Sequence, residues 1–179
     1  MRKVIVIIGV VIAILAIGYM ANLKYTKSFS PESVAKYNRD GLSINVYYSQ
    51  PSRKGRLIFG SVAEALVPYG KLWRTGANEA TEIEFNKPLS IAGQKLAAGR
   101  YTLFTIPNED HWTVIFNTEL GQWGVFTYEE KDDLLTASAI VEQKEDLVEM
   151  FTINFEEDRD NVNLVMSWAH TKAILPLHY

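Results

Sequence analysis

Residues 73–81 hold the densest group of side chains in the chain that could bind or react with a ligand. Arg74 offers five N–H donors in a planar fork that fits a carboxylate, a phosphate or a sulfate. Asn78 both donates and accepts hydrogen bonds, and Glu79 can exchange a proton or pair with a cation. Beside the indole of Trp73, these groups predict the floor of a polar ligand pocket.

The same segment also has a structural interpretation, which we favour. Arg74 and Glu79 then pair with each other or with the backbone and hold a long loop onto the body of the protein, while Gly76 forms a turn. Ion pairs that only stabilise a fold give the same dense polar pattern as a binding site. If the ligand interpretation holds instead, Glu79 is the candidate catalytic acid or base, Arg74 the binder and Asn78 the orienting group.

A basic cluster, Arg53-Lys54-Gly55-Arg56, lies earlier in the same long segment, in which residues 50–78 show few strand signals. Arg53 and Arg56 are candidate anion ligands, although runs of charge are more often solvated surface. A segment of this length without regular structure is usually functional or an extended packed connection. We therefore look for a site in this region.

Three tryptophans supply either a stacking platform for flat ligands or anchors of a hydrophobic core. Core anchors are the favoured interpretation for Trp73 and Trp168. Trp123 stands between Gly121 and Gly124, which predict a turn that presents its indole to solvent. Trp123 is therefore the candidate ligand contact among the three.

Several chemistries have no support in the sequence. There is no cysteine and no HxH or HxxxH spacing, so we expect no metal site and no cofactor. His170 falls in a predicted hairpin turn at residues 168–171. The chain has a net charge of −3, which is unfavourable for nucleic acid. No nucleophile elbow or phosphate-binding loop is present.

The amino terminus reads as a membrane segment, because residues 4–21 carry no charge and follow Arg2 and Lys3. As a helix this run is roughly 27 Å long, close to the hydrocarbon thickness of a bilayer. It is either a retained signal anchor or a cleaved signal peptide. Its length and the poor cleavage site Met20-Ala21-Asn22 favour the anchor. Arg2 and Lys3 on one side of the segment face Lys24 and Lys27 on the other, so the charge bias is slight. A short amino-terminal tail before a large domain still favours a cytoplasmic tail, which places residues 22–179 on the extracytoplasmic (periplasmic) side.

The chain divides into three parts by pattern. Residues 1–21 are the transmembrane segment, residues 22–40 a polar stalk with a short helix that starts near Ser30-Pro31, and residues 41–179 one β domain. The alternation of apolar and polar residues begins at Gly41. A further short helix is expected at residues 61–67, inside a loop.

About eight strands with turn residues between them predict an all-β fold, an antiparallel β-sandwich or jelly roll. The expected strands are residues 42–48, 80–85, 100–106, 112–117, 135–143, 148–155, 161–168 and 172–177.

Several runs of sequence after Ser30 form a distinctive set: Tyr48-Ser49-Gln50-Pro51-Ser52, Leu66-Val67-Pro68-Tyr69-Gly70-Lys71, Trp73-Arg74-Thr75-Gly76-Ala77-Asn78-Glu79-Ala80-Thr81, Ala98-Gly99-Arg100-Tyr101 and Gly121-Gln122-Trp123-Gly124. On these runs the chain resembles the exported bacterial domain-of-unknown-function family 2911 (DUF2911). The resemblance implies a small exported β domain and brings no established activity.

These observations favour a non-catalytic binding or protein-interaction domain, an accessory subunit held at the membrane through residues 4–21 with a partner in a membrane complex. Its small-molecule ligand, if it has one, is not identified by any motif. The alternative is an extracytoplasmic hydrolase that acts on a glycan, peptide or ester through Arg74, Asn78 and Glu79. A sandwich hosts many functions, so the fold does not decide between them.

Overall fold

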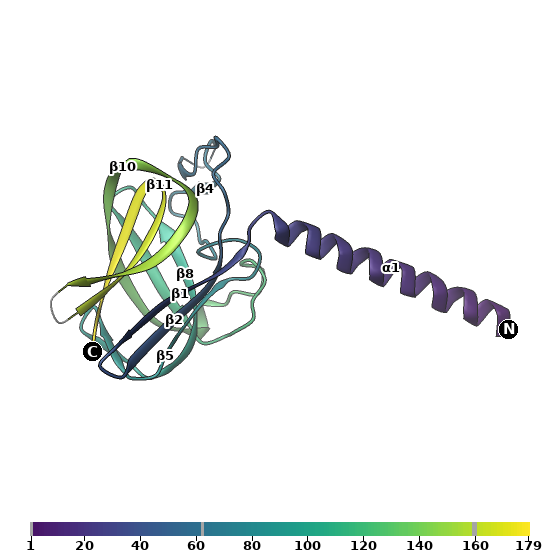
Figure 1. The fold of residues 1–179 in the computed structure, drawn as a ribbon, viewed down its shortest axis with the longest axis horizontal. Coiled ribbons are helices and arrows are strands. Elements are labelled where there is room, and N and C mark those ends of the chain that lie inside the picture. The colour runs from purple at the N-terminus through teal and green to yellow at the C-terminus, as the bar shows by residue number, and fades with distance from the viewer. Residues whose placement is uncertain (1, 62, 159–160) are drawn as a thin grey trace.

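The computed structural model describes residues 2–61, 63–158 and 161–179. One long helix precedes a mostly β domain (Figure 1). The elements are α1 (Arg2–Ser28), β1 (Glu32–Arg39), β2 (Leu42–Ser49), β3 (Phe59–Gly60), β4 (Val67–Pro68), β5 (Thr81–Phe85), β6 (Leu89–Ile91), β7 (Gln94–Leu96), β8 (Gly99–Pro107), β9 (His111–Asn117), the 3₁₀ turn η1 (Glu130–Asp132), β10 (Asp133–Asp158) and β11 (Asn161–His178).

Nine strands form one antiparallel sheet in the order β1-β2-β5-β8-β9-β10-β11-β6-β7, and β3 pairs with β4 in a small parallel sheet. The large sheet curls so that its first strands meet the far end of β10 (Figure 1). The hydroxyl of Tyr48 on β2 donates to the carbonyl of Ile153 and accepts from its N–H, at 3.3 and 3.1 Å. The predicted all-β antiparallel fold with one amino-terminal helix is therefore confirmed.

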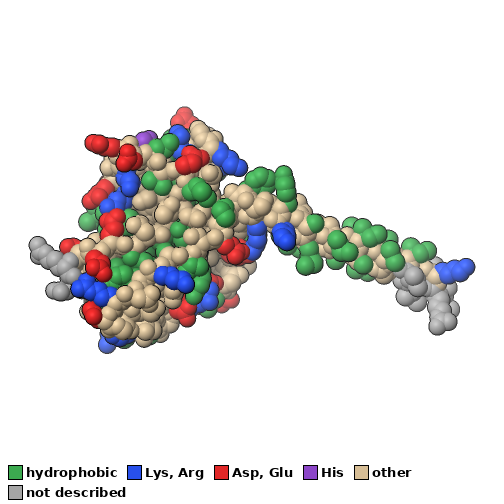
Figure 2. Space-filling view, in the orientation of Figure 1, with side chains coloured by type: hydrophobic (Ala, Val, Ile, Leu, Met, Phe, Trp, Pro, Cys, Tyr) green, Lys and Arg blue, Asp and Glu red, His purple; other side chains and the backbone are tan. Residues whose placement is uncertain are grey.

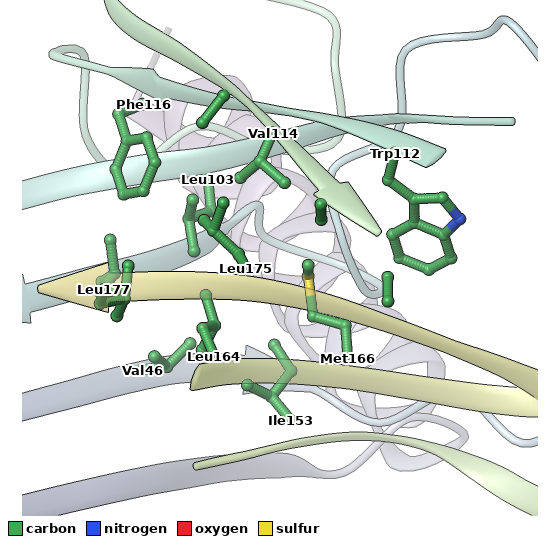
Figure 3. Packing of buried hydrophobic residues seen from close by; sticks show 14 of the residues in the cluster. Val46, Leu103, Trp112, Val114, Phe116, Ile153, Leu164, Met166, Leu175 and Leu177 are labelled. Carbon is green, nitrogen blue, oxygen red and sulfur yellow. The ribbon is translucent and has the colours of Figure 1, made fainter. Parts of the chain in front are cut away.

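The curled sheet encloses one core between its two halves. Side chains from β2, β8, β9, β10 and β11 point toward one another there (Figure 3). At one end of the core, five aromatic rings pack in mutual contact, with centroids 5.0–6.1 Å apart: Phe59, Trp73, Trp112, Phe151 and Trp168. The interpretation of Trp73 and Trp168 as core anchors is confirmed, since both are buried.

The stalk helix predicted near Ser30 is wrong, because residues 32–39 form β1 instead. This strand pairs with β2 along its whole length, and Ala35 and Tyr37 on alternate positions are buried. Asp40 and Gly41, which join the two strands, both have positive φ, at 51° and 74°. An Asp-Gly pair favours the tight hairpin turn that places β1 beside β2. The sheet thus begins before Gly41, where the sequence pattern placed its start.

Two pairs of predicted strands are single strands in the structure. Residues 135–143 and 148–155 both belong to β10, and residues 161–168 and 172–177 both belong to β11. Their pairing shifts register twice, near Val148, and Ala169 opposite it has φ 54°. A bulge of this kind bends a strand without ending it. The predicted hairpin turn at residues 168–171 is therefore wrong, and His170 lies within β11.

The helix predicted at residues 61–67 is also not found. The described residues of this stretch, all except residue 62, form turns and then enter β4 at Val67. Leu66 and Val67 donate backbone hydrogen bonds to the carbonyls of Leu57 and Ile58. A single turn forms at Ser61, whose carbonyl accepts from the N–H groups of Glu64 and Ala65, and extended pairing then prevents the turn from continuing as a helix.

Helix α1 projects from the domain, and its side chains from Ile7 onward are almost all exposed (Figure 2). Residues Ile7–Ser28 form a helix long and apolar enough to cross a membrane, although a signal sequence has the same properties. Both sequence-based interpretations of this segment are compatible with the structure. The carboxyl end of α1 contacts the domain, as described below.

Candidate functional site

The segment between β4 and β5 follows a fixed path, because Trp73 is tied to β8. The backbone groups of Trp73 and Thr105 exchange hydrogen bonds of 2.7 and 2.9 Å. The chain then turns sharply, with positive φ at Thr75, Gly76 and Asn78. The indole N–H of Trp73 donates to the carbonyl of Gly76 at 3.0 Å, which closes the turn.

Gly76 permits this turn in a place where no side chain fits. A Cβ atom there would lie 3.0 Å from the carbonyl oxygen of Ser49, and φ is +155°. We expect Gly76→Ala to lower the free energy of unfolding by about 1–3 kcal/mol, from clash and backbone strain. Chemical denaturation followed by circular dichroism measures this. The matched control is Gly93→Ala, which also has positive φ but nothing within 4 Å of the added atom. An equal loss in both variants would contradict the close approach to Ser49.

Arg74 lies on one side of this segment and lines a cavity of about 500 Å³, which we name the Arg74 pocket. Its walls come from the end of α1, the loops around β3 and β4, the turn at Gly76 and two core tryptophans. The lining residues are Phe29, Ser30, Pro51, Ser52, Lys54, Arg56, Leu66, Val67, Trp73, Arg74, Gly76, Ala77 and Trp168. The walls therefore combine apolar and aromatic surface with three cations, and they include no carboxylate.

The guanidinium of Arg74 is the most unusual group in the pocket. Its Nε atom is buried and has no hydrogen-bond partner in the part of the chain that the structure describes. Among the described residues, no carboxylate forms an ion pair with Arg74. Burial lowers the pKa of Arg74, because the charged form loses solvation without gaining a partner. Arg74 is half-buried, and partial burial of a cation without an ion-pair partner among the described residues costs free energy, which favours an anion at this wall of the pocket.

The other two cations of the pocket, Lys54 and Arg56, belong to the basic cluster. Arg56 donates from Nε to the carbonyl of Arg53 and from Nη2 to that of Ser52, at 3.0 and 2.5 Å. Lys54 Nζ lies 5.0 Å from the centre of the Phe29 ring. The carboxylate of Glu149 accepts from the Lys54 N–H at 2.8 Å and holds the loop, but does not line the pocket.

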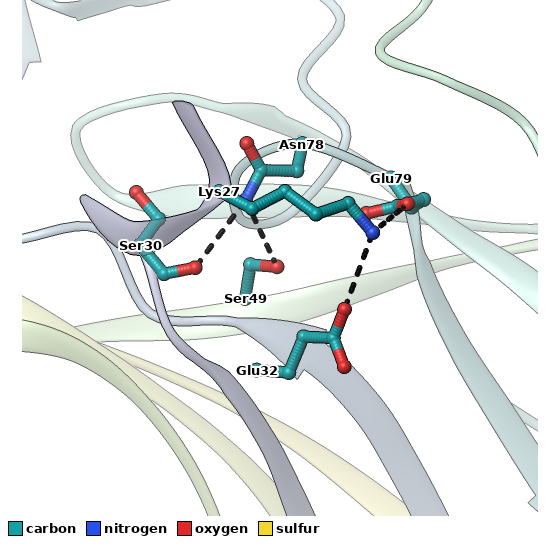
Figure 4. A network of polar contacts seen from close by, with 6 residues as sticks. All are labelled: Lys27, Ser30, Glu32, Ser49, Asn78 and Glu79. Atoms are coloured by element: carbon teal, nitrogen blue, oxygen red, sulfur yellow. Dashed lines mark hydrogen bonds and ion pairs between the residues drawn. The ribbon is translucent and has the colours of Figure 1, made fainter. Parts of the chain in front are cut away.

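Glu79 and Asn78 lie on another side of the segment and contact the end of α1. Lys27, in the last turn of α1, forms ion pairs with Glu79 and with Glu32, the latter at 3.3 Å (Figure 4). The amide of Asn78 donates to the carbonyl of Ser30 at 3.3 Å (Figure 4). We name these five residues the helix junction. Their contacts fix the direction in which α1 leaves the domain.

The structure thus separates the residues of the predicted pocket. The expected pair between Arg74 and Glu79 is wrong, because Glu79 pairs with Lys27 instead. Arg74 lines the Arg74 pocket, whereas Glu79 lines a different cavity, of about 240 Å³, beside β1 and β2. Asn78 is buried and serves the helix junction.

Of the remaining candidate site residues, Arg56 lies in the Arg74 pocket, and Arg53 and Trp123 lie outside it. Arg56 lines the Arg74 pocket, while Arg53 faces a neighbouring smaller cavity that Arg56 also borders. Trp123 is 38% exposed, as its glycine neighbours predicted, and lies beside Lys27, whose Nζ is 5.9 Å from the centre of its ring. It does not line the Arg74 pocket.

Sequence reasoning did not select Lys54, Phe29 or Ser52 as site residues. Lys54 stands in the basic cluster, so its charge was a usable signal. Phe29 and Ser52 carried no signal, because only the folded chain brings the end of α1 next to the loop after β2.

Comparison with known proteins gives one result. The model of a family described as "Protein of unknown function (DUF2911)" matches residues 30–177. No curated protein and no solved structure matches the chain. The match covers the β domain from before β1 to Leu177 in β11, and all lining residues of the Arg74 pocket except Phe29.

Proposed function

Because the chain belongs to the DUF2911 family, whose function is unknown, we propose its function from the site: it is a membrane-anchored, non-catalytic binding subunit whose Arg74 pocket holds an anionic ligand. The observation that carries this proposal is a half-buried Arg74 on the wall of a cavity that holds two further cations and no carboxylate among its described lining residues. The buried Nε of Arg74 has no hydrogen-bond partner among the described residues. A planar guanidinium suits a carboxylate, phosphate or sulfate group.

The walls of the pocket indicate what else the ligand carries. Trp73, Trp168, Leu66 and Phe29 line the cavity beside the cations. Ligand pockets are typically apolar with a few placed polar groups that set orientation. The matching ligand is therefore an anion attached to a flat or apolar body, rather than a bare inorganic ion.

A binding role fits the described groups better than a hydrolytic one. Glu79, the candidate acid or base, is occupied by Lys27 and lines a different cavity from Arg74. General acid–base catalysis needs a group within hydrogen-bond reach of the bound substrate. The pocket itself supplies positive charge and a binding surface.

The proposed location is the extracytoplasmic side of a membrane that α1 crosses, with a partner subunit in that membrane. The apolar stretch of α1 supports the anchor, and the short tail before it supports this orientation, since Arg2 and Lys3 are balanced by Lys24 and Lys27 after the stretch. The pocket then lies next to the membrane, since Phe29 and Ser30 directly after α1 are part of its wall.

The test is a calorimetric titration of the full chain in zwitterionic nanodiscs with phenyl phosphate, and with phenol as the neutral analogue. We expect phenyl phosphate to bind at least about tenfold more tightly, because a charge-assisted hydrogen bond contributes about 1.5–3 kcal/mol. Added salt should weaken this binding. Equal binding of phenol, or no binding of either compound, would refute an anion site.

A pair of variants separates the pocket from general surface charge. Arg56→Met removes a cation that lines the pocket, whereas Arg39→Met removes one from β1, where Arg39 pairs with Glu157 at 3.2 Å. Both change the net charge equally. We expect weaker phenyl phosphate binding in Arg56→Met and unchanged binding in Arg39→Met.

A further inference from the structure

The loop after β9 carries an exposed apolar surface beside the end of α1. Residues 120–128 contain no charged side chain. Leu120, Trp123 and Phe126 are exposed, and Phe126 is 84% exposed. We name these nine residues the aromatic loop. In water, this much apolar surface on one loop is unfavourable, and such patches commonly mark an interaction surface.

The exposure does not result from a loose loop, because its backbone is tied to the domain at several points. The carbonyl of Gln122 accepts from Ala80 N–H at 2.9 Å, and Gly124 N–H donates to the carbonyl of Asn78 at 3.0 Å. The buried side chain of Gln122 donates to Asn117 Oδ1 at 3.2 Å. The loop is therefore held with Trp123 and Phe126 facing outward.

The position of the loop relative to α1 indicates what covers it. Lys27 lies six residues beyond Ala21, the end of the uncharged run. The uncharged run is about 27 Å long and the hydrocarbon core about 30 Å thick, so the core reaches about 3 Å past Ala21. Lys27, about 9 Å past Ala21, then lies about 6 Å outside the core, within a headgroup layer about 5–8 Å deep. Trp123 lies beside Lys27. Figure 1 shows the aromatic loop, between β9 and β10, on the side of the domain from which α1 leaves.

From this geometry we propose that the aromatic loop rests in the interfacial layer of the membrane that α1 crosses, a surface contact additional to the anchor. The inference rests on the proposed anchoring of α1. Tryptophan and other aromatic side chains favour this layer, where one part of the ring system is apolar and another is hydrated. Tyr25 near the end of α1 and Phe29 directly after it are also exposed, and their rings pack against each other with centroids 4.9 Å apart.

The contact has a consequence for the proposed function. The helix junction and the aromatic loop together hold the domain close to the bilayer in one orientation. The Arg74 pocket, which includes Phe29, then opens near the headgroup layer. Ligands that reside in or near the membrane surface gain access to it.

Tryptophan fluorescence tests the proposal, because Trp73, Trp112 and Trp168 are buried and Trp123 is exposed. The full chain is placed in zwitterionic nanodiscs with or without a lipid that carries a nitroxide on its headgroup. The emission of Trp123 is the difference between the spectra of the wild type and Trp123→Phe. We expect the nitroxide lipid to quench this emission. Aqueous iodide should quench it weakly. Strong iodide quenching without nitroxide quenching would overturn the proposal.

A second variant and a second measurement keep the test independent of folding. Phe126→Asp changes an exposed side chain and should leave the core intact, which circular dichroism checks. We expect this variant to show weaker nitroxide quenching of Trp123 and stronger iodide quenching of Trp123. A carbonate wash of native membranes tests the anchor separately. A chain that is released overturns the anchor and the loop contact together. A retained chain whose Trp123 is quenched by iodide alone overturns the loop contact and leaves the anchor in place.

Discussion

Trp73→Ala is expected to lower the free energy of unfolding by about 3–5 kcal/mol, the usual cost of emptying a large aromatic site in a core. The Trp73 side chain packs against four other rings, with centroids 5.0–5.9 Å away. Its indole N–H also closes the turn at Gly76. Denaturant unfolding of the full chain in detergent, followed by near-ultraviolet circular dichroism, measures the loss.

Trp123→Ala is the matched control, because it removes the same side chain from an exposed position. We expect it to cost about 1 kcal/mol or less, including the contact with Lys27. A similar loss in the two variants would contradict the division between core and surface tryptophans. It would also weaken the argument that Trp73 forms a rigid wall of the Arg74 pocket.

Arg74→Met is expected to change stability and binding in opposite directions. Without a ligand, the variant should be more stable by about 1 kcal/mol, because it removes a half-buried cation whose buried Nε has no partner among the described residues, and keeps an apolar stem in its place. For a chain of this size, that corresponds to a rise in Tm of about 2–4 °C. The affinity for an anion should fall by about 10- to 100-fold.

Arg100→Met provides the matched control for the stability measurement. Arg100 is paired with Glu82 at 2.6 Å and lies over the Tyr47 ring at 4.5 Å, so its removal breaks existing contacts. We expect Tm to fall in this variant and to rise in Arg74→Met, both measured by differential scanning calorimetry. A fall in both variants would mean that Arg74 stabilises the fold and would argue against a prepared anion site.

The central strands were predictable from sequence because their pattern is local. In β2, apolar and polar residues alternate from Leu42 to Tyr48, and Leu42, Ile44 and Val46 are indeed buried. The predicted breaks in β10 and β11 came from residues that form a bulge rather than a turn. Ala169 with positive φ carries no sequence signal, since alanine rarely adopts that conformation. The strand β1 was missed, although Asp40-Gly41 is a strong hairpin signal.

The sequence was sufficient to predict which residues belong to candidate sites, but not which residues they contact. The sequence pattern drew attention to Arg56, Arg74 and Glu79 as charged groups in one long segment. Which carboxylate meets which cation depends on contacts between distant residues, such as Lys27 with Glu79. Neither the ion pair across the helix junction nor the absence of a partner for Arg74 among the described residues follows from spacing. The ion pair forms only when the domain folds against the end of α1.

The most direct test of the account is a titration of phenyl phosphate into the wild-type chain, Arg74→Met and Arg74→Lys, each in zwitterionic nanodiscs with empty nanodiscs as the blank. The account predicts saturable binding to the wild type, about 10- to 100-fold weaker binding to Arg74→Met, and partial retention in Arg74→Lys, which keeps the charge and loses the planar fork. Equal affinity in the wild type and in a folded Arg74→Met would contradict the proposal that the Arg74 pocket is an anion-binding site.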